Sequence, residues 1–439
     1  MSSPHDPTHD PLLESHPDTP RPYALFEAFG VECEYMIVDA ATLDVRPIAD
    51  KLLLEAATLP GAEPHFEDGS AVPTEVGLGP VSWSNELCAH VIELKTSAPA
   101  PSLDHVADSF QDSIALANAM LAPMGCALLP TGMHPWMNPD REMTLWPHGF
   151  NHVYAAFDRI FNCKGHGWCN LQSTHLNLPF QGDDEFARLH AAIRALLPIM
   201  PTLAASSPFI DGAASRSLDN RMAVYARNAR AIASVAGDVI PEPVWSRADY
   251  QRVILDRIAA DLAPHDPEGI LESEWCNSRG CIARFSRSAI EIRVLDVQEC
   301  PMADLAILRL ITAVLRSLTD KRGPHQPALR ALPSSRLRAI LDLTIDGADT
   351  AIISDANYLA ALGLPPSPTP ALRLWQALAE RAGASFDQAT REILDVLFRE
   401  GSLATRIRRR LGDRTDRRAL QSLYADLARS LASGKLFRA

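Results

Sequence analysis

The fold is decided by a ten-residue stretch near the start of the chain, Phe29-Gly30-Val31-Glu32-Cys33-Glu34-Tyr35-Met36-Ile37-Val38. Side chains two apart on a β-strand point to the same face. A strand here therefore places Glu32 and Glu34 on one side and apolar residues on the other. Two carboxylates in apolar surroundings are costly unless they are paired or bind a cation. A solvent-facing strand side is the alternative, so this stretch alone predicts a strand and leaves its chemistry open.

Other segments share the alternation or the apolar periodicity of regular elements. Strands are predicted near residues 24–38, 88–96, 125–131, 171–180 and 289–297. Helices are predicted over residues 103–121, 184–197 and 302–318, and from about residue 334 the chain indicates helices only, broken by a Pro-rich loop at 364–370. Strands interleaved irregularly with helices, without a βαβ rhythm, predict an α+β fold with a largely antiparallel sheet.

The composition excludes several classes of protein. An apolar fraction of 47% rules out disorder along the whole chain. Lys+Arg number 41 and Asp+Glu 54, so the net charge of −13 argues against a nucleic-acid or membrane-surface binder. Eight cysteines favour buried thiols in a reducing cytosol, no signal peptide is recognisable, and no apolar run reaches the ~18 residues of a membrane span. We expect a cytoplasmic protein whose first 22 residues form a disordered tail.

Two more strand-like segments carry polar side chains in apolar surroundings. Glu93 lies within Val-Ile-Glu-Leu, and Glu86 lies seven residues upstream, where it can approach the same site. An ion pair between Glu93 and Lys95 is the simpler interpretation. In the segment at 172–180, His175 and Asn177 share one face of a strand that is otherwise apolar. A lone buried histidine is more often a hydrogen-bonded core residue than a ligand.

A carboxylate and a guanidinium share one face of the last predicted strand. Glu291 and Arg293 alternate with Ile290, Ile292 and Val294. They can form a structural ion pair, or a metal ligand beside a group that binds phosphate. The residues alone leave both interpretations open.

A turn at residues 130–136, Pro-Thr-Gly-Met-His-Pro-Trp, places His134 at a loop tip. Loops often carry binding residues, although a packed turn without a ligand explains the segment equally well. Seven arginines against two aspartates mark residues 406–418. That run predicts a solvated, partly self-paired helix pair, with a subunit contact or a phosphate-facing patch as alternatives.

One explanation accounts for the four polar strands together. A sheet face that collects carboxylates from Glu32, Glu34, Glu86, Glu93 and Glu291 suits a hard cation such as Mg²⁺ or Mn²⁺. Such ions usually bridge to substrate phosphates. Arg293, with Arg287 as a second candidate, would then neutralise charge on a transferring phosphoryl group. The phosphate-binding loops of P-loop and Rossmann proteins do not occur in the sequence.

The ordered motifs resemble those of glutamate–cysteine ligases and their carboxylate–amine ligase relatives, within the glutamine synthetase-like superfamily. They are Gly-Val-Glu-Cys-Glu-Tyr, Val-Ile-Glu-Leu-Lys-Thr, Thr-Gly-Met-His-Pro-Trp, His-Leu-Asn-Leu and Ile-Glu-Ile-Arg-Val-Leu-Asp-Val, and the likeness covers roughly residues 24–320. It implies a curved, largely antiparallel sheet funnel with outer helices. It also implies that ATP phosphorylates a carboxylate and that an amine then displaces the phosphate. A catalytic domain is expected at 23–330, with a helical part at 331–439 packed on it.

The resemblance also implies roles for individual residues. Six residues match metal ligands of the family: Glu32, Glu34, Glu86, Glu93, His175 and Glu291. The positions that match nucleotide contacts are His175, Asn177 and Arg293. Those that match catalytic groups are Glu291, Arg287 and Arg293. His134, Arg221 and Tyr225 match the region that holds the substrate. Two departures concern the amine: Asn177 stands where many carboxylate–amine ligases have histidine, and Ala226 separates Tyr225 from Arg227.

Three hypotheses follow. The first is ATP- and Mg²⁺-dependent ligation of glutamate to an amine, with cysteine as the expected acceptor and another amine as the alternative. The second is a guanidino-type phosphotransferase of the same fold family, and the third is a metal- or nucleotide-binding scaffold without turnover. The sequence leaves homo-oligomer formation open.

Overall fold

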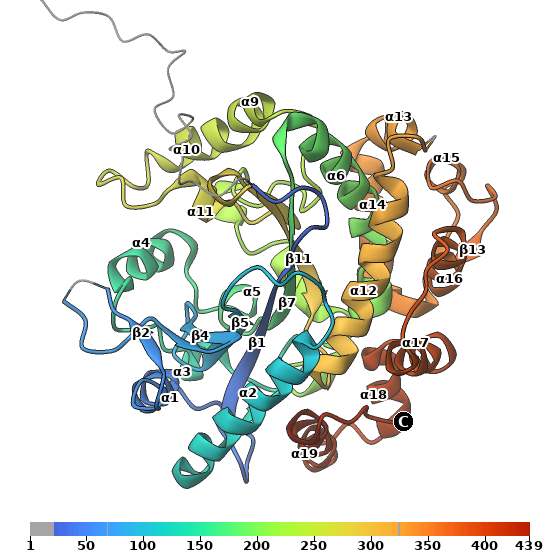
Figure 1. Cartoon of the computed structure of the whole chain (residues 1–439). Coiled ribbons are helices and arrows are strands. Elements are labelled where there is room, and N and C mark those ends of the chain that lie inside the picture. The colour runs from blue at the N-terminus through green and yellow to red at the C-terminus, as the bar shows by residue number, and fades with distance from the viewer. Residues whose placement is uncertain (1–21, 68, 324) are drawn as a thin grey trace, which may run out of the picture.

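A computed structural model describes residues 22–67, 69–323 and 325–439. The predicted tail at 1–22 lies almost entirely outside these residues. Across the described chain, nine strands form one antiparallel sheet in the order β10-β11-β7-β1-β5-β4-β3-β2, with β6 paired to β1 (Figure 1). β1 is central because it pairs with β5 along one edge and with β7 and then β6 along the other.

The strands of this sheet are short apart from β1, β7 and β11. Their bounds are β1 (Gly30–Asp39), β2 (Glu63–His65), β3 (Glu75–Leu78), β4 (Val81–Asn85), β5 (Val91–Thr96), β6 (Cys126–Leu129), β7 (Ser173–Pro179), β10 (Cys281–Arg284) and β11 (Ala289–Asp296). Two small pairs lie outside it: β8 (Phe209–Ile210) with β9 (Ala213–Ala214), and β12 (Ile352–Ile353) with β13 (Thr369–Pro370).

Helices surround the sheet and make up most of the C-terminal quarter (Figure 1). Those before residue 331 are α1 (Ala49–Ala56), α2 (Val106–Leu121), α3 (Pro139–Glu142), α4 (Asn151–Phe161), α5 (His166–Cys169), α6 (Gly182–Leu196), α7 (Pro201–Ala204), α8 (Asn220–Tyr225), α9 (Arg247–Tyr250), α10 (Asp256–Leu262), α11 (Ser273–Cys276), α12 (Pro301–Leu318) and α13 (His325–Arg330). Those after it are α14 (Ser334–Gly347), α15 (Ala356–Ala361), α16 (Ala371–Arg381), α17 (Gln388–Glu400), α18 (Leu403–Leu411) and α19 (Arg417–Ser433).

The sheet has one apolar face and one polar face. Val31, Cys33 and Tyr35 of β1 are fully buried in the main hydrophobic core. The long helices α2, α6 and α12 contact one another or the sheet and contribute to the same core. The alternate residues of β1, Glu32 and Glu34, therefore lie on the opposite face. Because helices cover the apolar face of the sheet, a binding site can form only on its polar face.

The predicted α+β class with a largely antiparallel sheet is confirmed. The predicted strand near 24–38 begins only at Gly30, because a turn comes first, with Phe26 at a φ of 61° and the amide of Glu27 donating to the carbonyl of Ala24. Strands β2, β3, β4 and β10 were not predicted. The prediction of helices only beyond residue 334 is wrong at one place, where the two-residue strands β12 and β13 pair.

The C-terminal helices pack on the sheet and on its covering helices. α17 contacts α12, and α19 contacts β6 and α2. Two arginines of the Arg-rich run point inward: Arg406 pairs with the buried Glu299 at 2.5 Å, and Arg408 donates to the carbonyl of Pro208 at 2.8 Å. These two arginines therefore attach the C-terminal helices to the rest of the chain. The other arginines of the run, at 409, 410, 414, 417 and 418, are exposed.

Within the described ranges, no helix is both long enough and apolar enough to cross a membrane.

Candidate active site

A cavity of about 1020 Å³ opens on the polar face of the sheet. Its lining includes Glu32, Glu34, Glu86, Glu93 and Glu291, so the predicted carboxylates all meet in one place. The volume is at the upper end of the range for small-molecule sites. It therefore has room for a nucleotide and a small substrate together.

The strand register explains why residues so distant in sequence converge. Glu32 lies opposite His175 of β7, and Glu34 lies opposite Glu93 of β5. Glu291 of β11 lies opposite Asn177 of β7. Cross-strand partners have Cβ atoms roughly 5 Å apart on one face of the sheet. Four neighbouring strands thus present a continuous polar stripe.

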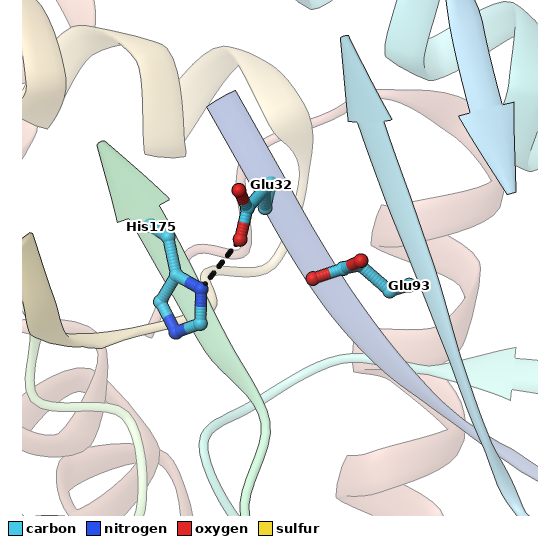
Figure 2. Close-up of side chains that lie close together, drawn as sticks. All are labelled: Glu32, Glu93 and His175. Atoms are coloured by element: carbon cyan, nitrogen blue, oxygen red, sulfur yellow. Dashed lines mark hydrogen bonds and ion pairs between the residues drawn. The ribbon is translucent and has the colours of Figure 1, made fainter. Parts of the chain in front are cut away.

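One part of the cluster centres on Glu32. Its Oε2 is 2.8 Å from Nδ1 of His175, and its Oε1 accepts a hydrogen bond of 2.9 Å from the amide of Asn177. Figure 2 shows Glu32 and His175 turned toward each other, with Glu93 on the other side of β1. Ligand atoms of Glu32, Glu93 and His175 lie within 4.8 Å of one another, close enough to share one ion.

A second part centres on Glu34. Its Oε2 accepts hydrogen bonds from the amide and the hydroxyl of Ser173, at 2.7 and 2.9 Å. The Ser173 hydroxyl is also 2.8 Å from Nε2 of His175, so one side chain orients two others. Ligand atoms of Glu34, Glu86 and Glu93 again lie within 4.8 Å of one another. Glu93 thus belongs to both groups of candidate ligands.

Glu291 is held by two guanidinium groups. Arg293 forms an ion pair with its Oε1, and the Nε of Arg284 lies 3.2 Å from its Oε2. The structural ion pair predicted for Glu291 and Arg293 therefore exists, and it lies inside the cavity. Nε of Arg293 is buried and has no hydrogen-bond partner among the described residues. The Arg293 side chain is nevertheless 25% exposed and lines the cavity, so part of its guanidinium can reach a ligand.

The electrostatics of the two ends of the cluster differ. Burial and the neighbouring carboxylates raise the pKa values of Glu32, Glu86 and Glu93. Burial would also raise the pKa of Glu291, but the charge of Arg293, followed by His175 and Arg284, lowers it to about 2. Burial and the charge of Arg293 lower the pKa of His175. Glu291 is therefore compensated by the protein, whereas Glu32, Glu86 and Glu93 receive less positive charge than their burial requires.

The donor set fits a hard divalent cation. Carboxylate oxygens with one neutral imidazole suit Mg²⁺ or Mn²⁺. Lys95 supplies part of the missing charge, because its Nζ is 2.8 Å from Oε2 of Glu75 and 3.6 Å from Oε2 of Glu93. No comparable cation reaches Glu86 within the described chain, where Oε2 accepts only the amide of Leu87, at 3.3 Å. A bound cation would complete this part of the site.

The residues matched to substrate contacts have different surroundings. Arg221 is buried, with Nη2 donating to the carbonyl of Arg293 at 2.8 Å and Nη1 3.5 Å from Asp296. Tyr225 donates from its hydroxyl to the carbonyl of Ser278 at 2.7 Å. Both line the cavity, as does Arg287, which is exposed on a short 3₁₀ turn at Phe285–Arg287.

The structure does not bring His134 into the cluster. Its ring is buried, its Nε2 is 2.7 Å from the carbonyl of Leu43, and its Nδ1 lies 3.3 Å from the amide of Trp136. Both ring nitrogens thus contact backbone groups, and the residue does not line the cavity. This placement corrects the predicted contact of His134 with substrate and corresponds to the packed turn.

Sequence reasoning assigned no role to three residues that orient the cluster, although strand alternation places Ser173 on the polar face with His175 and Asn177. Ser84 donates its hydroxyl to Glu93 at 2.7 Å, Ser173 orients Glu34, and Arg284 holds Glu291. Alternation in Val-Ser-Trp-Ser-Asn at β4 is a signal that could have found Ser84. Arg284 gives no such signal, because a hairpin turn brings it beside Glu291.

Comparison with known proteins adds evidence that does not depend on this geometry. A model of glutamate-cysteine ligase family 2 matches residues 28–344. The chain is 33% identical over 412 residues to an uncharacterized protein of Archaeoglobus fulgidus, and the match covers 93% of this chain and 99% of that relative. It is 24% identical over 303 residues to a proposed glutamate–cysteine ligase 2-1 of Nocardioides sp., covering 68% and 70% of the two chains.

Among solved structures, the fold is similar to that of a glutamate–cysteine ligase of Francisella tularensis in complex with AMP. The TM-score is 0.57 at 12% identity, and the match covers 92% of this chain and 88% of that chain. This likeness shows that the fold extends over nearly the whole chain.

Proposed function

The chain belongs to glutamate-cysteine ligase family 2, and from that premise we propose that it joins the γ-carboxylate of glutamate to an amine. ATP would first phosphorylate the carboxylate, and the amine would then displace phosphate to form an amide. Cysteine is the reference acceptor, because the family and a relative carry the name of glutamate–cysteine ligases. With cysteine the product would be γ-glutamylcysteine, a precursor of glutathione.

The single observation that carries the proposal is the convergence of the five predicted glutamates with His175, one lysine and four arginines in one cavity. Each carboxylate comes from a different point of the sequence, and the shared face of the sheet brings them together. A cluster of this kind is costly to bury without a cation. A metal-bound nucleotide explains both the acidic residues and the arginines beside them.

The candidate ligands fall into the two groups that share Glu93. Glu32 and His175 would complete the first group, and Glu34 and Glu86 the second. Mg²⁺ bound there would neutralise the phosphate oxygens of ATP and orient the γ-phosphate. Ser84, Ser173 and Asn177 would orient the ligating oxygens, as hydrogen-bonded neighbours of metal ligands commonly do.

The arginines would act on the charge that moves during phosphoryl transfer. Arg293 is fixed by Glu291 on one side and is partly exposed in the cavity, so it would stabilise the phosphoryl group in the transition state. Arg287 lies at the cavity rim, where it would contact the outer phosphates. Arg221 and Tyr225 lie beside Arg293 and would hold the carboxylate substrate.

Two broader assignments belong to the same proposal. Residues 23–330 would form the catalytic domain, and residues 331–439 would support it, partly through the contact of Arg408 with Pro208. All eight cysteines are buried free thiols, as is usual in a reducing compartment. We therefore expect the protein to act in the cytoplasm.

ATP turnover with glutamate and a panel of amines tests the proposal. Amine-dependent release of free phosphate and of an amide of the expected mass would support ligation. A stable phosphorylated product without free phosphate would instead indicate a phosphotransferase. ATP binding without turnover for any amine would indicate a scaffold, and either result would overturn the proposal.

A further inference from the structure

One wall of the cavity is apolar and aromatic, in contrast to the charged sheet face. Tyr154 and Phe157 of α4, Trp168 of α5 and Trp275 of α11 all line the cavity, and we call these four residues the aromatic wall. Phe157 lies at the centre, with ring centroids 4.8 Å from Trp168 and 5.2 Å from Trp275, both edge to face. Trp275 is 41% exposed although it is part of this cluster. The wall therefore offers an indole surface to a ligand.

The aromatic wall is fixed to the acidic cluster at two points. The Tyr154 hydroxyl accepts a hydrogen bond of 3.0 Å from the amide of Asn85, the residue before Glu86. On the other side, Nη1 of Arg284 donates to the carbonyl of Glu274 at 2.9 Å while its Nε contacts Glu291. Glu274 directly precedes Trp275. The wall is thus held beside the centre where the acyl phosphate would form.

The adenosine end of the nucleotide would have another place in the cavity. Gly30, Pro179 and Ala289 line the cavity at strand positions beyond the carboxylates. At roughly 3.3 Å per strand residue, Gly30 lies about 13 Å along β1 from Glu34. Gly30 lies two residues beyond Glu32, so this rim continues the polar face past the candidate metal ligands, and we assign the adenosine end to it. The wall near Glu86 is left for the second substrate.

The charges near the aromatic wall disfavour an acceptor with a carboxylate. Glu272 and Glu274 lie on either side of Ser273 on the chain leading into Trp275, and both line the cavity. Among the described cations of the cavity, Lys95, Arg284 and Arg293 pair with glutamates. Arg221 pairs with Asp296 and would hold glutamate, and Arg287 would contact phosphate, so none of these cations is assigned to the acceptor. Aromatic faces beside acidic groups attract an ammonium group as it enters.

We propose that the amine acceptor carries an aromatic or similarly bulky apolar group and no carboxylate, and that the aromatic wall holds that group. The inference rests on the proposed function and replaces cysteine as the preferred acceptor. The amine nitrogen attacks the acyl carbon of γ-glutamyl phosphate, a C–N bond forms, and the C–O bond to phosphate breaks. Free phosphate leaves, and the surplus proton of the amine passes to solvent.

The test uses the full-length protein with ATP, glutamate, Mg²⁺ and one amine at a time. We expect kcat/KM for 2-phenylethylamine to exceed that for cysteine and for phenylalanine at least tenfold. Trp275→Ala should raise the KM for 2-phenylethylamine at least tenfold and leave the KM for ATP within twofold. Trp275→Phe should retain most of the activity. Because Trp275 is partly exposed on a one-turn helix, both variants should fold.

Three results would overturn the inference. Cysteine or phenylalanine could be used better than 2-phenylethylamine, in which case the proposed function would still stand. Trp275→Ala could raise the KM for ATP instead of the amine, which would assign the wall to adenine. No turnover with any amine would remove the proposed function itself, so the two failures are distinguishable.

Discussion

Glu34 of β1 and Glu93 of β5 lie directly opposite each other on antiparallel strands, and both are buried. Like charges in this position destabilise a sheet. Ser173 and Ser84 each donate a hydrogen bond to one of these carboxylates, but a hydroxyl supplies no charge. Lys95 lies 3.6 Å from Glu93 but is closer to Glu75, so it supplies only part of the missing charge. The pair therefore indicates that the polar face of the sheet is built to be completed by a cation.

Divalent cations should stabilise the protein. We expect Mg²⁺ or Mn²⁺ to raise the melting temperature of chelator-treated protein, with a stabilisation of about 2.7 kcal/mol at a concentration one hundred times Kd. Glu86→Gln should lose most of this response. Without cation it should be at least as stable as the wild type, because a neutral amide replaces a carboxylate that burial and Glu34 disfavour. Thermal unfolding against cation concentration measures both effects.

The matched control is Glu63→Gln, which changes an exposed carboxylate on β2. It should retain the full response to cations. A wild-type protein that shows no shift with either ion would contradict the metal assignment.

Ser173 should affect the site by orienting two candidate metal ligands. Ser173→Ala removes the hydroxyl that contacts both Glu34 and His175, while the backbone amide still donates to Glu34. Loss of such an orienting contact typically costs ten- to one-hundredfold in metal affinity. We expect about a tenfold rise in the Mn²⁺ concentration for half-maximal stabilisation. Ser82→Ala, whose hydroxyl contacts Ser97 instead, should leave it unchanged.

Arg293 should matter for its planar, fixed guanidinium and not only for its charge. Arg293→Lys keeps the charge but loses the planar fork that contacts Glu291 and faces the cavity. We expect kcat for ATP turnover to fall at least one-hundredfold, the usual cost of one transition-state donor. Arg257→Lys, on the exposed side of α10, is the control. Near-normal kcat in Arg293→Lys would remove this arginine from the mechanism.

The sheet face of the site was predictable because strand alternation is a local property. Glu32, Glu34 and Glu291 lie in apolar runs, on the face opposite to the apolar residues next to them. This alternation within one strand does not depend on how the strand pairs with its neighbours. The register itself depends on distant pairing, so the sequence could not show that Glu34 faces Glu93. The resemblance to a family assigned roles to the motifs, and the structure showed which of their side chains are in contact.

Residues outside that pattern were not predictable. Arg284 reaches Glu291 through a hairpin, and the aromatic wall joins α4, α5 and α11 from three separate segments. For His134, a local sequence pattern was present but predicted the wrong role. Its motif looks like a binding loop, yet burial and two backbone contacts make it a packing residue.

Stability should depend on pH through Asp304. Burial is the main cause that raises the pKa of this carboxyl to about 8, and its Oδ2 has no partner among the described residues. Between about pH 4 and 8 the folded state therefore holds a proton that the unfolded state has lost. This contribution to the free energy of unfolding is fully present below pH 4 and is lost as the pH rises to 8, by at most about 1.4 kcal/mol per unit.

Asp304→Asn should remove this loss of stability with rising pH. The asparagine oxygen can still accept the hydrogen bond from Thr174, and the amide has no titratable proton. Denaturant unfolding at pH 5 and pH 8 measures this effect. The free energy of unfolding of the variant should rise relative to that of the wild type as the pH rises. Asp108→Asn, at an exposed position of α2, should run parallel to the wild type. A constant difference between Asp304→Asn and the wild type would contradict the assignment.

The acyl phosphate is the central claim, and isotope transfer tests it most directly. Glutamate labelled with ¹⁸O in its γ-carboxylate is incubated with ATP, Mg²⁺ and an accepted amine, and the released phosphate is analysed by mass spectrometry. The account predicts one ¹⁸O atom in each phosphate, because the carboxylate oxygen leaves with the transferred phosphoryl group. Phosphate without ¹⁸O, released together with the amide, would contradict it.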